Sequence, residues 1–373
     1  MIINIGIRTK GIPQIRKNDN FIIVENLLIG DGFHWEKTIE ARLPGEITYV
    51  NAGINNSTAY GSNVSLINHA PMETYLECVV GSEMNPTAPE EFLKAHAVIS
   101  RSWAVGKVFD IHFKGREGSI NNYNTLIGWE DTASHRGFHV CSDDHCQRYQ
   151  GLQPISKEAE RVIHDTEGEI LVSSSGKIID ARFSKCCGGK TELFSTCWQS
   201  VDPLSIESID DPWCDLFSLD PIERESLLKS ILKDYDLATE NYGFRWTSEI
   251  SKKEIKENLK KRFNRDVGVI KEIDPLHRGP SGRIDLLRIY GTSGYLDLGK
   301  ELWIRRLLSP THLYSSNFEV EERGEIIKIK GRGWGHGVGL CQIGAAHMAA
   351  KGASYKEILE FYYPGSRLQK LYI

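Results

Sequence analysis

The chain has no long apolar run. None of its 373 residues lies in a stretch approaching the roughly 20 apolar residues that a membrane-spanning helix needs. Its first 30 residues alternate isoleucine with polar residues and contain no signal-peptide hydrophobic segment. No membrane segment is therefore expected in this chain. The protein either stays inside the cell or has its export segment outside the sequence given.

The chain also has no excess of basic over acidic residues. The formal net charge is −5, whereas nucleic-acid-binding proteins usually have a basic face, so nucleic acid is not an expected partner. The chain shows no internal repeat and no low-complexity tract. A hydrophobic content of 40% and a charged content of 25% indicate a soluble globular protein with a sizeable core.

The common nucleotide-binding motifs are incomplete. The stretch SKCCGGKT ends in GKT, but Ser184 stands where a phosphate-binding loop needs glycine. The following ELFSTCWQSVDP is too broken to be the long helix that such a loop precedes. The glycine-rich run from Gly331 contains no G-x-G-x-x-G. Nucleotide binding is therefore not expected.

The chain opens with short strands and continues with two helices. Residues 1–70 alternate apolar and polar residues between turn signals. Pro71 marks the start of the first predicted helix and Gly81 its end. Thr87 and Glu90 predict a capping box at the start of the second helix.

Strands and helices are segregated along the chain, which predicts an α+β fold. We expect a β-rich core, a helical pair and a charged helical insertion. The predicted boundaries are an N-terminal β-rich segment at 1–65, the core at 66–220 and 285–373, and the insertion at 221–284.

Glu83 is the first candidate for chemistry, because it lies between the two predicted helices beside the apolar Val79 and Met84. Apolar neighbours disfavour the ionised carboxylate, as a general acid requires. Lys94 and Arg101 are seven residues apart, so they share one face of the second helix and could bind an anionic or hydroxyl-rich ligand. Alternatively, Glu83 caps the next helix and the two cations face water.

A cluster of metal-binding residue types occurs in SHRGFHVCSDDHCQRYQG. It places His135, His139, Cys141, His145 and Cys146 within twelve residues. Thiolate and imidazole suit a closed tetrahedral Zn²⁺ site. We therefore predict a structural zinc ion bound by Cys141, Cys146, His135 and His145.

Two alternatives to this zinc site stay open. The ligand set could include Cys186 or Cys187 after folding, or the loop could hold reduced thiols without metal. The chain has eight cysteines, enough for four disulfides, but adjacent Cys186 and Cys187 cannot easily bond to each other.

Long segments towards both ends of the chain carry a family resemblance. They are METYLECVVGSEMNPTAPEEFLKAHAVISRSWAV and GRGWGHGVGLCQIGAAHMAAKGASYKEILEFYYPG, with DARFSKCCGGKTE between them. These segments resemble, in order, the signatures of the stage II sporulation protein D family of peptidoglycan lytic transglycosylases. The resemblance covers about residues 65–373.

The resemblance implies a role for several residues. The family's catalytic acid falls on Glu83, its helix lysine and arginine on Lys94 and Arg101, and its glycine-flanked histidine on His336, followed by Gln342. The chain departs from the family pattern at three positions, where cysteine replaces serine or threonine: Cys186, Cys187 and Cys341.

The glycines around His336 need a reason, because glycine is costly in regular structure. The resemblance implies that they form a flat wall for a polysaccharide, with the ring of Trp334 against sugar carbons and a hydrogen bond from His336. The alternative is that His336 is a buried structural histidine that holds the loops together.

The implied activity is cleavage of the bond between N-acetylmuramic acid (MurNAc) and N-acetylglucosamine (GlcNAc) in peptide-stripped glycan strands. The products would carry 1,6-anhydro-MurNAc ends. Most glycosidases use two carboxyl groups, whereas this reaction needs only one. The resemblance also implies a sporulation-related role in the cell envelope. Two alternatives are a non-catalytic amidase enhancer or glycan-binding module with a cell-wall amidase as partner, and a cytoplasmic thiol-rich protein.

Overall fold

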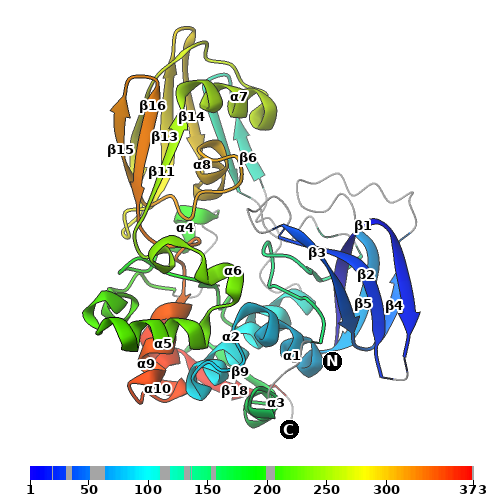
Figure 1. Ribbon diagram of the computed structural model, residues 1–373. Coiled ribbons are helices and arrows are strands. Elements are labelled where there is room, and N and C mark those ends of the chain that lie inside the picture. The colour runs from blue at the N-terminus through cyan, green and yellow to red at the C-terminus, as the bar shows by residue number, and fades with distance from the viewer. Residues whose placement is uncertain are drawn as a thin grey trace.

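The computed structural model describes residues 1–18, 20–30, 36–50, 64–109, 118–129, 135, 137–152, 157–198 and 206–371. The buried residues form two separate hydrophobic cores. One lies in a unit made of residues 118–129 and 246–331, called the β unit below and drawn at the top of Figure 1. The other lies in the remaining described residues, called the main body.

The β-rich opening is confirmed. Five strands pair antiparallel in the order β3-β2-β1-β5-β4. Their bounds are β1 (Ile2–Lys17), β2 (Ile22–Ile29), β3 (Lys37–Leu43), β4 (Glu46–Tyr49) and β5 (Val64–Pro71). The isoleucine alternation of β1 puts Ile3, Ile5 and Ile7 into the core. A short strand, β8 (Val140–Cys141), pairs parallel with β1 and so fixes the cysteine-rich loop to this sheet.

Helices pack beside this sheet in the main body (Figure 1). They are α1 (Met72–Glu83), α2 (Glu90–Val108), α3 (Lys157–Asp165), α4 (Phe194–Cys197), α5 (Pro221–Ile231), α6 (Asp234–Leu237), α9 (Gln342–Ala350) and α10 (Tyr355–Tyr362). Short strands of the main body are β9 (Glu169–Val172), β10 (Phe183–Ser184), β17 (Leu340–Cys341) and β18 (Arg367–Lys370). The parallel pair β10–β17 brings Ser184 opposite Cys341, across more than 150 residues of chain.

Two predicted helix boundaries were wrong. Helix α1 continues through Gly81 to Glu83. Helix α2 begins at Glu90 after Pro89, without a side-chain cap. The Thr87 hydroxyl instead donates to Asn85 Oδ1, which stabilises a turn before the helix.

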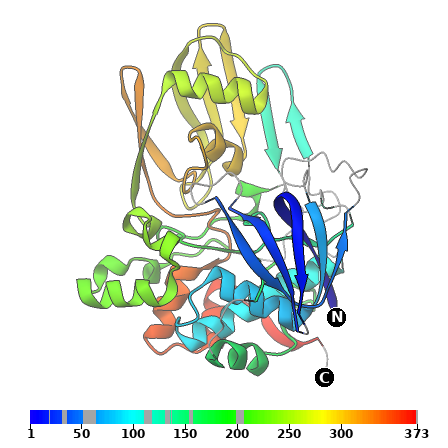
Figure 2. The same ribbon diagram turned by 45° about the vertical axis from the view of Figure 1, so that its right-hand side comes forward.

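The β unit contains two antiparallel or mixed sheets, in the orders β12-β13-β14-β7-β6 and β11-β16-β15 (Figures 1 and 2). Its strands are β6 (Gly118–Asn121), β7 (Thr125–Trp129), β11 (Trp246–Ser251), β12 (Ile270–Arg278), β13 (Ile284–Gly291), β14 (Gly294–Gly299), β15 (Phe318–Arg323) and β16 (Ile326–Gly331). Its helices are α7 (Lys252–Phe263) and α8 (Glu301–Leu307).

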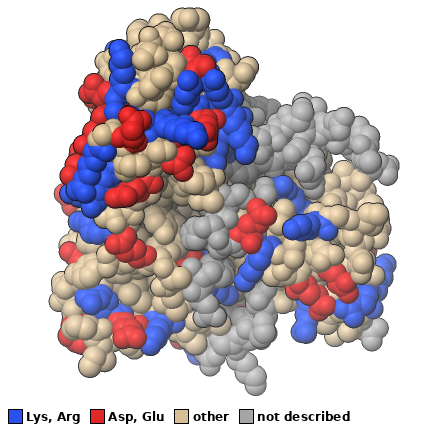
Figure 3. All heavy atoms as spheres, turned by 45° about the horizontal axis from the view of Figure 1, so that its top comes forward, with Lys and Arg blue, Asp and Glu red and all other residues tan. Residues whose placement is uncertain are grey.

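The stretch 221–284, predicted as one charged helical insertion, is divided between the two units. Helix α5 lies in the main body, whereas α7 belongs to the β unit together with strands β11 and β12. Ile255 and Leu259 anchor α7 in the core, one turn apart. Figure 3 shows lysine and arginine side chains interspersed with acidic ones on the surface of this unit.

The predicted α+β class is confirmed, with segregated sheets and helices in both units. Among the described residues, no helix combines the length and the apolar character that crossing a membrane requires.

Candidate active site

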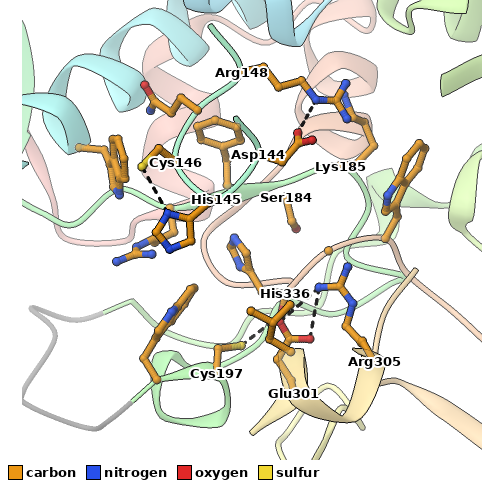
Figure 4. A pocket seen from close by; sticks show the side chains of 18 of the residues that line it. Asp144, His145, Cys146, Arg148, Ser184, Lys185, Cys197, Glu301, Arg305 and His336 are labelled. Atoms are coloured by element: carbon orange, nitrogen blue, oxygen red, sulfur yellow. Dashed lines mark hydrogen bonds and ion pairs between the residues drawn. The ribbon is translucent and has the colours of Figure 1, made fainter. Parts of the chain in front are cut away.

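A cavity of about 210 Å³ opens where the main body meets the β unit. The main body contributes the end of α1, the 144–148 and 181–185 segments and the 334–336 segment, and the β unit contributes β7 and α8. Figure 4 shows side chains from both units pointing toward this space. Five tryptophans of the described residues line it: Trp103, Trp129, Trp198, Trp303 and Trp334. A cavity with aromatic walls and polar groups is suited to a small or extended polar ligand.

Glu83 lies in this cavity as the last residue of α1. Its side chain is 6% exposed, and Oε1 accepts a hydrogen bond from the backbone N–H of Arg148 at 3.0 Å. Among the described residues, Oε2 has no hydrogen-bond partner, which leaves it available to a ligand. The predicted apolar neighbours Val79 and Met84 are buried beside it.

Two lysines stabilise the end of α1 that carries Glu83. Lys233 Nζ donates to the carbonyl of Gly81, and Lys185 Nζ donates to the carbonyl of Glu83 at 3.2 Å. Cations near a helix C-terminus interact favourably with its unpaired carbonyls and its dipole. Two lysine side chains therefore hold the backbone at the end of α1 that carries the carboxylate.

A buried ion-pair network lies behind Glu83. Asp236 is 0% exposed and contacts Arg148 Nη1 at 3.3 Å and Lys185 Nζ at 3.2 Å. Burial alone would raise the pKa of Asp236, but Arg148 and Lys185 more than offset it and hold the pKa below its ordinary value. Asp236 thus stays ionised and fixes the two cations that contact Glu83 through a backbone N–H and a side-chain amine.

Asp144 is a second carboxyl group in the cavity. Its Oδ1 accepts from Arg148 Nε at 2.5 Å, whereas its Oδ2 is buried without a hydrogen-bond partner (Figure 4). Burial raises the pKa of Asp144 to about 7, despite the opposing effect of Arg148. Sequence reasoning missed this residue, although the acidic pair in CSDDHC was a signal. It also missed Glu301, which pairs with Arg305 at 3.4 Å on the β-unit side.

Lys94 and Arg101 do not line the cavity, so the expected cationic pair beside Glu83 is not there. Lys94 forms ion pairs with Glu90 at 2.7 Å and Glu91 at 2.9 Å. Arg101 is 0% exposed and pairs with Glu73 at 2.6 Å. Lys94 thus pairs with the first turn of its own helix and Arg101 with Glu73 of α1, and these pairs take up both charges.

Four other arginines and lysines supply the cationic side chains of the cavity. They are Arg148, Arg182, Lys185 and Arg305. Arg148 comes from the cysteine-rich loop, and Arg182 and Lys185 come from the DARFSK segment. Arg182 also packs its guanidinium 4.2 Å from the centre of the Trp198 ring, a cation–π contact.

His336 lines the cavity and stays neutral. The N–H of Val338 donates to its Nδ1 at 3.0 Å, which places the proton of the neutral ring on Nε2. Burial and three nearby guanidinium groups hold its pKa well below the ordinary value, and a hydrogen bond with the Phe183 backbone opposes them only partly. The guanidinium groups belong to Arg182, Arg283 and Arg305. These bonds to the backbone fit the structural alternative, and the contact of His336 with sugar stays a prediction.

The backbone conformation and the packing of the protein itself explain the glycines of the 333–339 segment. Every second residue from Gly333 to Gly339 is a glycine at positive φ. A Cβ on Gly337 would lie 2.4 Å from Arg283 Cζ, and one on Gly339 would lie 2.1 Å from the carbonyl oxygen of Arg182. The backbone conformation and close protein neighbours thus require these glycines, without any ligand.

Trp334 and Gln342 both line the cavity, as expected. The Trp334 ring meets Tyr314 edge-on with centroids 5.7 Å apart. Gln342 is buried, and its Nε2 lies 2.9 Å from His96 Nε2. Burial, and then Lys185, lower the pKa of His96 to about 3, so the neutral ring accepts this hydrogen bond from the amide.

The predicted metal ligands come together. The ligand atoms of His135, Cys141, His145 and Cys146 all lie within 4.8 Å of one another. Cys141 Sγ is 3.8 Å and Cys146 Sγ 3.7 Å from His145 Nδ1, close to the edge of a tetrahedral zinc site. His145 and Cys146 also line the cavity (Figure 4).

Other residues of the metal prediction lie elsewhere. His139 is directed to the first strand, where its Nδ1 accepts from the N–H of Asn4 at 3.0 Å. Cys186 and Cys187 contact a different set of buried residues, described below, and not this group. The rival ligand set is therefore not the one that folding assembles here.

Parts of the chain are similar to known proteins. A family model described as Stage II sporulation protein matches residues 60–172, which include Glu83 and the metal-ligand group. The chain is 25% identical over 305 residues to "Stage II sporulation protein D" of Bacillus subtilis, covering 82% of this chain and 76% of that protein. Residues 60–172 are therefore similar to the SpoIID family. The resemblance seen in the sequence is confirmed.

Two further relatives of the chain are an uncharacterized protein of Brachyspira hyodysenteriae and the "Amidase enhancer" of Bacillus subtilis. The first is 28% identical over 313 residues, covering 82% of this chain and 68% of that protein. The second is 28% identical over 235 residues, covering 57% and 33%. A second family model, described as a domain of unknown function (DUF8618), matches residues 192–339 and thus most of the β unit. The cavity is lined from both matched segments.

Proposed function

We propose that this protein is a peptidoglycan lytic transglycosylase with Glu83 as its general acid and base. The relatives named for stage II sporulation and for amidase enhancement support a cell-wall-related function. The observation that carries the finer proposal is the Glu83 carboxyl, which is buried at the cavity with Oε1 held by the Arg148 N–H and Oε2 available.

The proposed reaction uses this one carboxyl group twice. Protonated Glu83 gives its proton to the oxygen that links C1 of MurNAc to GlcNAc, and the C1–O bond breaks. The resulting carboxylate takes the proton of the MurNAc C6 hydroxyl while O6 bonds to C1. The product is a 1,6-anhydro sugar, no water is consumed, and Glu83 ends protonated as it began. Such acid–base catalysis contributes about 10²–10⁴-fold to the rate.

The remaining residues of the cavity position the strand and the acid. The tryptophan faces would pack on sugar rings, and the cations Lys185 and Arg182 would donate to hydroxyl or carboxylate oxygens. The Arg148 N–H bond keeps one oxygen of Glu83 fixed, so that the other is presented to the glycosidic oxygen.

Incubation with peptide-free glycan strands, followed by mass spectrometry, tests the activity. We expect products with 1,6-anhydro-MurNAc ends. Products heavier by one water would instead indicate hydrolysis with a second carboxyl, for which Asp144 and Glu301 are in place. No cleavage of either peptide-free strands or intact wall material would contradict the proposed activity.

The second candidate is a non-catalytic partner of a cell-wall amidase, favoured by the 28% identity to the amidase enhancer. The two candidates share a location in the cell envelope, outside the cytoplasm. They differ in their dependence on the acid: an amidase partner carrying Glu83→Gln would still stimulate a purified cell-wall amidase.

We further propose that His135, Cys141, His145 and Cys146 bind a structural Zn²⁺ ion. The ion would hold the loop that contains Asp144 and is followed by Arg148, and thereby the N–H bond to Glu83.

For this group we predict that Cys146→Ser purifies with one equivalent of zinc less than the parent protein, because a closed site rarely keeps its metal after losing a thiolate. Elemental analysis of chelator-washed protein measures it. Cys78→Ala is the control, since Cys78 is buried outside both cysteine groups. Equal zinc in the parent and Cys146→Ser would exclude a metal here.

A further inference from the structure

A second group of potential metal ligands is buried in the main body, apart from the cavity. It consists of Cys187, Asp211, Cys214 and Cys341, whose ligand atoms lie within 4.8 Å of one another. Each of these residues is at most 1% exposed. The four come from three segments far apart in the chain: the loop after β10, the 3₁₀ turn Pro212–Cys214, and the residue before α9.

The spacing of these atoms matches a zinc site. Cys187 Sγ is 3.2 Å from Asp211 Oδ2, and Cys214 Sγ is 3.5 Å from Cys341 Sγ. With Zn–S near 2.3 Å and Zn–O near 2.1 Å, the ligand atoms of a tetrahedral site lie about 3.5–3.8 Å apart. The sulfur atoms are too far apart for a disulfide, whose S–S bond is about 2.0 Å.

The burial of the Asp211 carboxyl group indicates that the group lacks a cation. Its carboxyl is 0% exposed and is bonded to the Tyr362 hydroxyl at 3.0 Å and the Cys214 N–H at 3.2 Å. No lysine, arginine or histidine of the described residues forms an ion pair with it. Buried carboxylates are normally paired with a cation or bound to a metal. Asp236, equally buried, has two cations, so the protein supplies such partners where no metal is needed.

Backbone donors around the sulfur atoms suit negatively charged ligands. The N–H groups of Cys187 and Gly344 point to Cys341 Sγ at 3.2 and 3.4 Å, and the N–H of Gly189 points to Cys187 Sγ at 3.4 Å. Hydrogen bonds of this kind orient thiolates that bind metal and stabilise their charge.

We propose that Cys187, Asp211, Cys214 and Cys341 bind a second Zn²⁺ ion in a closed, four-coordinate structural site. Three thiolates and one carboxylate fill the tetrahedron, and complete burial leaves no open position for substrate. The ion joins the segment that carries Lys185 to the start of α9, which carries Gln342. The ion therefore fixes the backbone next to these two residues of the cavity. The proposed metal site does not depend on the proposed glycan chemistry.

The metal content of the whole protein tests this proposal. The double variant Cys141→Ser/Cys146→Ser removes the ligands of the first group and is expected to keep one equivalent of zinc. Adding Cys341→Ser is expected to reduce the content below about a tenth of an equivalent, because serine is a poor zinc ligand. Cys186→Ser is the matched control in the same loop: Cys186 is outside the ligand set and its variant should keep the metal.

A cobalt experiment keeps the test decisive if the triple variant fails to fold. The double variant, expressed with Co²⁺ in place of zinc, is expected to show strong thiolate-to-cobalt absorption. If the double variant folds but shows neither zinc nor this absorption, the proposal is overturned. Loss of the metal in Cys186→Ser would also overturn it. Titration of the denatured parent in chelator should find all eight cysteines free; six free thiols would mean that a disulfide, such as one between Cys186 and Cys214, takes the place of the metal.

Discussion

Glu83→Gln is expected to lower the rate of glycan-strand cleavage by about 10²–10⁴-fold, the usual contribution of a general acid and base. Glutamine has nearly the same volume, and its carbonyl oxygen can still accept the Arg148 N–H that now bonds to Oε1. The amide has no acidic proton to give and cannot take one from the C6 hydroxyl. The variant should therefore keep its fold and lose the chemistry. The measurement is the initial rate at which anhydro-MurNAc products appear.

Glu77→Gln is the matched control for this variant. Glu77 is a partly exposed carboxyl on the same helix α1, and it does not line the cavity. Its substitution should leave the cleavage rate within about twofold, since surface changes rarely move structure or stability much. If Glu83→Gln kept more than half of the parent rate with an unchanged circular dichroism spectrum, the acid would be another group. Asp144 would then be the next candidate, because its pKa of about 7 is suited to proton transfer.

Much of the fold follows from local pattern. The isoleucine alternation of β1 and the apolar periodicity of α1 and α2 predict elements that the structure contains. The helix ends do not follow as well. Gly81 is compatible with a helix interior because α1 is packed on all sides there. Thr87 fails as a cap because Asn85 Oδ1 bonds to its hydroxyl and N–H before the helix begins.

Local sequence pattern likewise predicts one part of the candidate site and misses another. The ligands from His135 to Cys146 are close in sequence, so a short-range pattern was sufficient to group them. Lys185, Asp236 and Glu301 join the cavity and its surroundings from positions more than 100 residues beyond Glu83, and only tertiary contacts show this. Helical periodicity correctly put Lys94 and Arg101 on one face of α2. It could not tell that Arg101 pairs with Glu73 of α1 and Lys94 with Glu90 and Glu91 of its own helix, and that neither lines the cavity.

The second large effect is expected for Asp236→Asn, which should reduce the free energy of unfolding by about 3–5 kcal/mol. The substitution leaves Lys185 and Arg148 buried with one anion fewer. Lys185 suffers most, because its remaining bonds are to the Glu83 carbonyl and the Met84 sulfur. Denaturant titration at pH 7 measures the loss. Asp210→Asn is the control: Asp210 is 83% exposed in its pair with Lys190, and exposed pairs contribute about 0–1 kcal/mol.

The lowered pKa of Asp236 determines how the stability loss in Asp236→Asn changes with pH. Because the pKa of Asp236 is lowered in the folded protein, its contribution to stability is present above the unfolded-state pKa of about 3.9 and is lost as the pH falls through the folded-state pKa. The difference between the parent and Asp236→Asn should therefore be full at pH 7 and should shrink below pH 4. A difference that is the same at both pH values would mean that packing, and not the charge, is responsible.

A double-mutant cycle assigns the effect to the buried cation. If the cost of Asp236→Asn comes from an uncompensated Lys185 ammonium, then Lys185→Met should restore part of the stability in the Asp236→Asn background. The same double variant should cleave glycan strands more slowly than the parent, because the Glu83 carbonyl would lose the Lys185 amine that holds the end of α1. Recovered stability without recovered activity would separate the two tasks of Lys185: compensating Asp236 and holding the backbone that carries the acid.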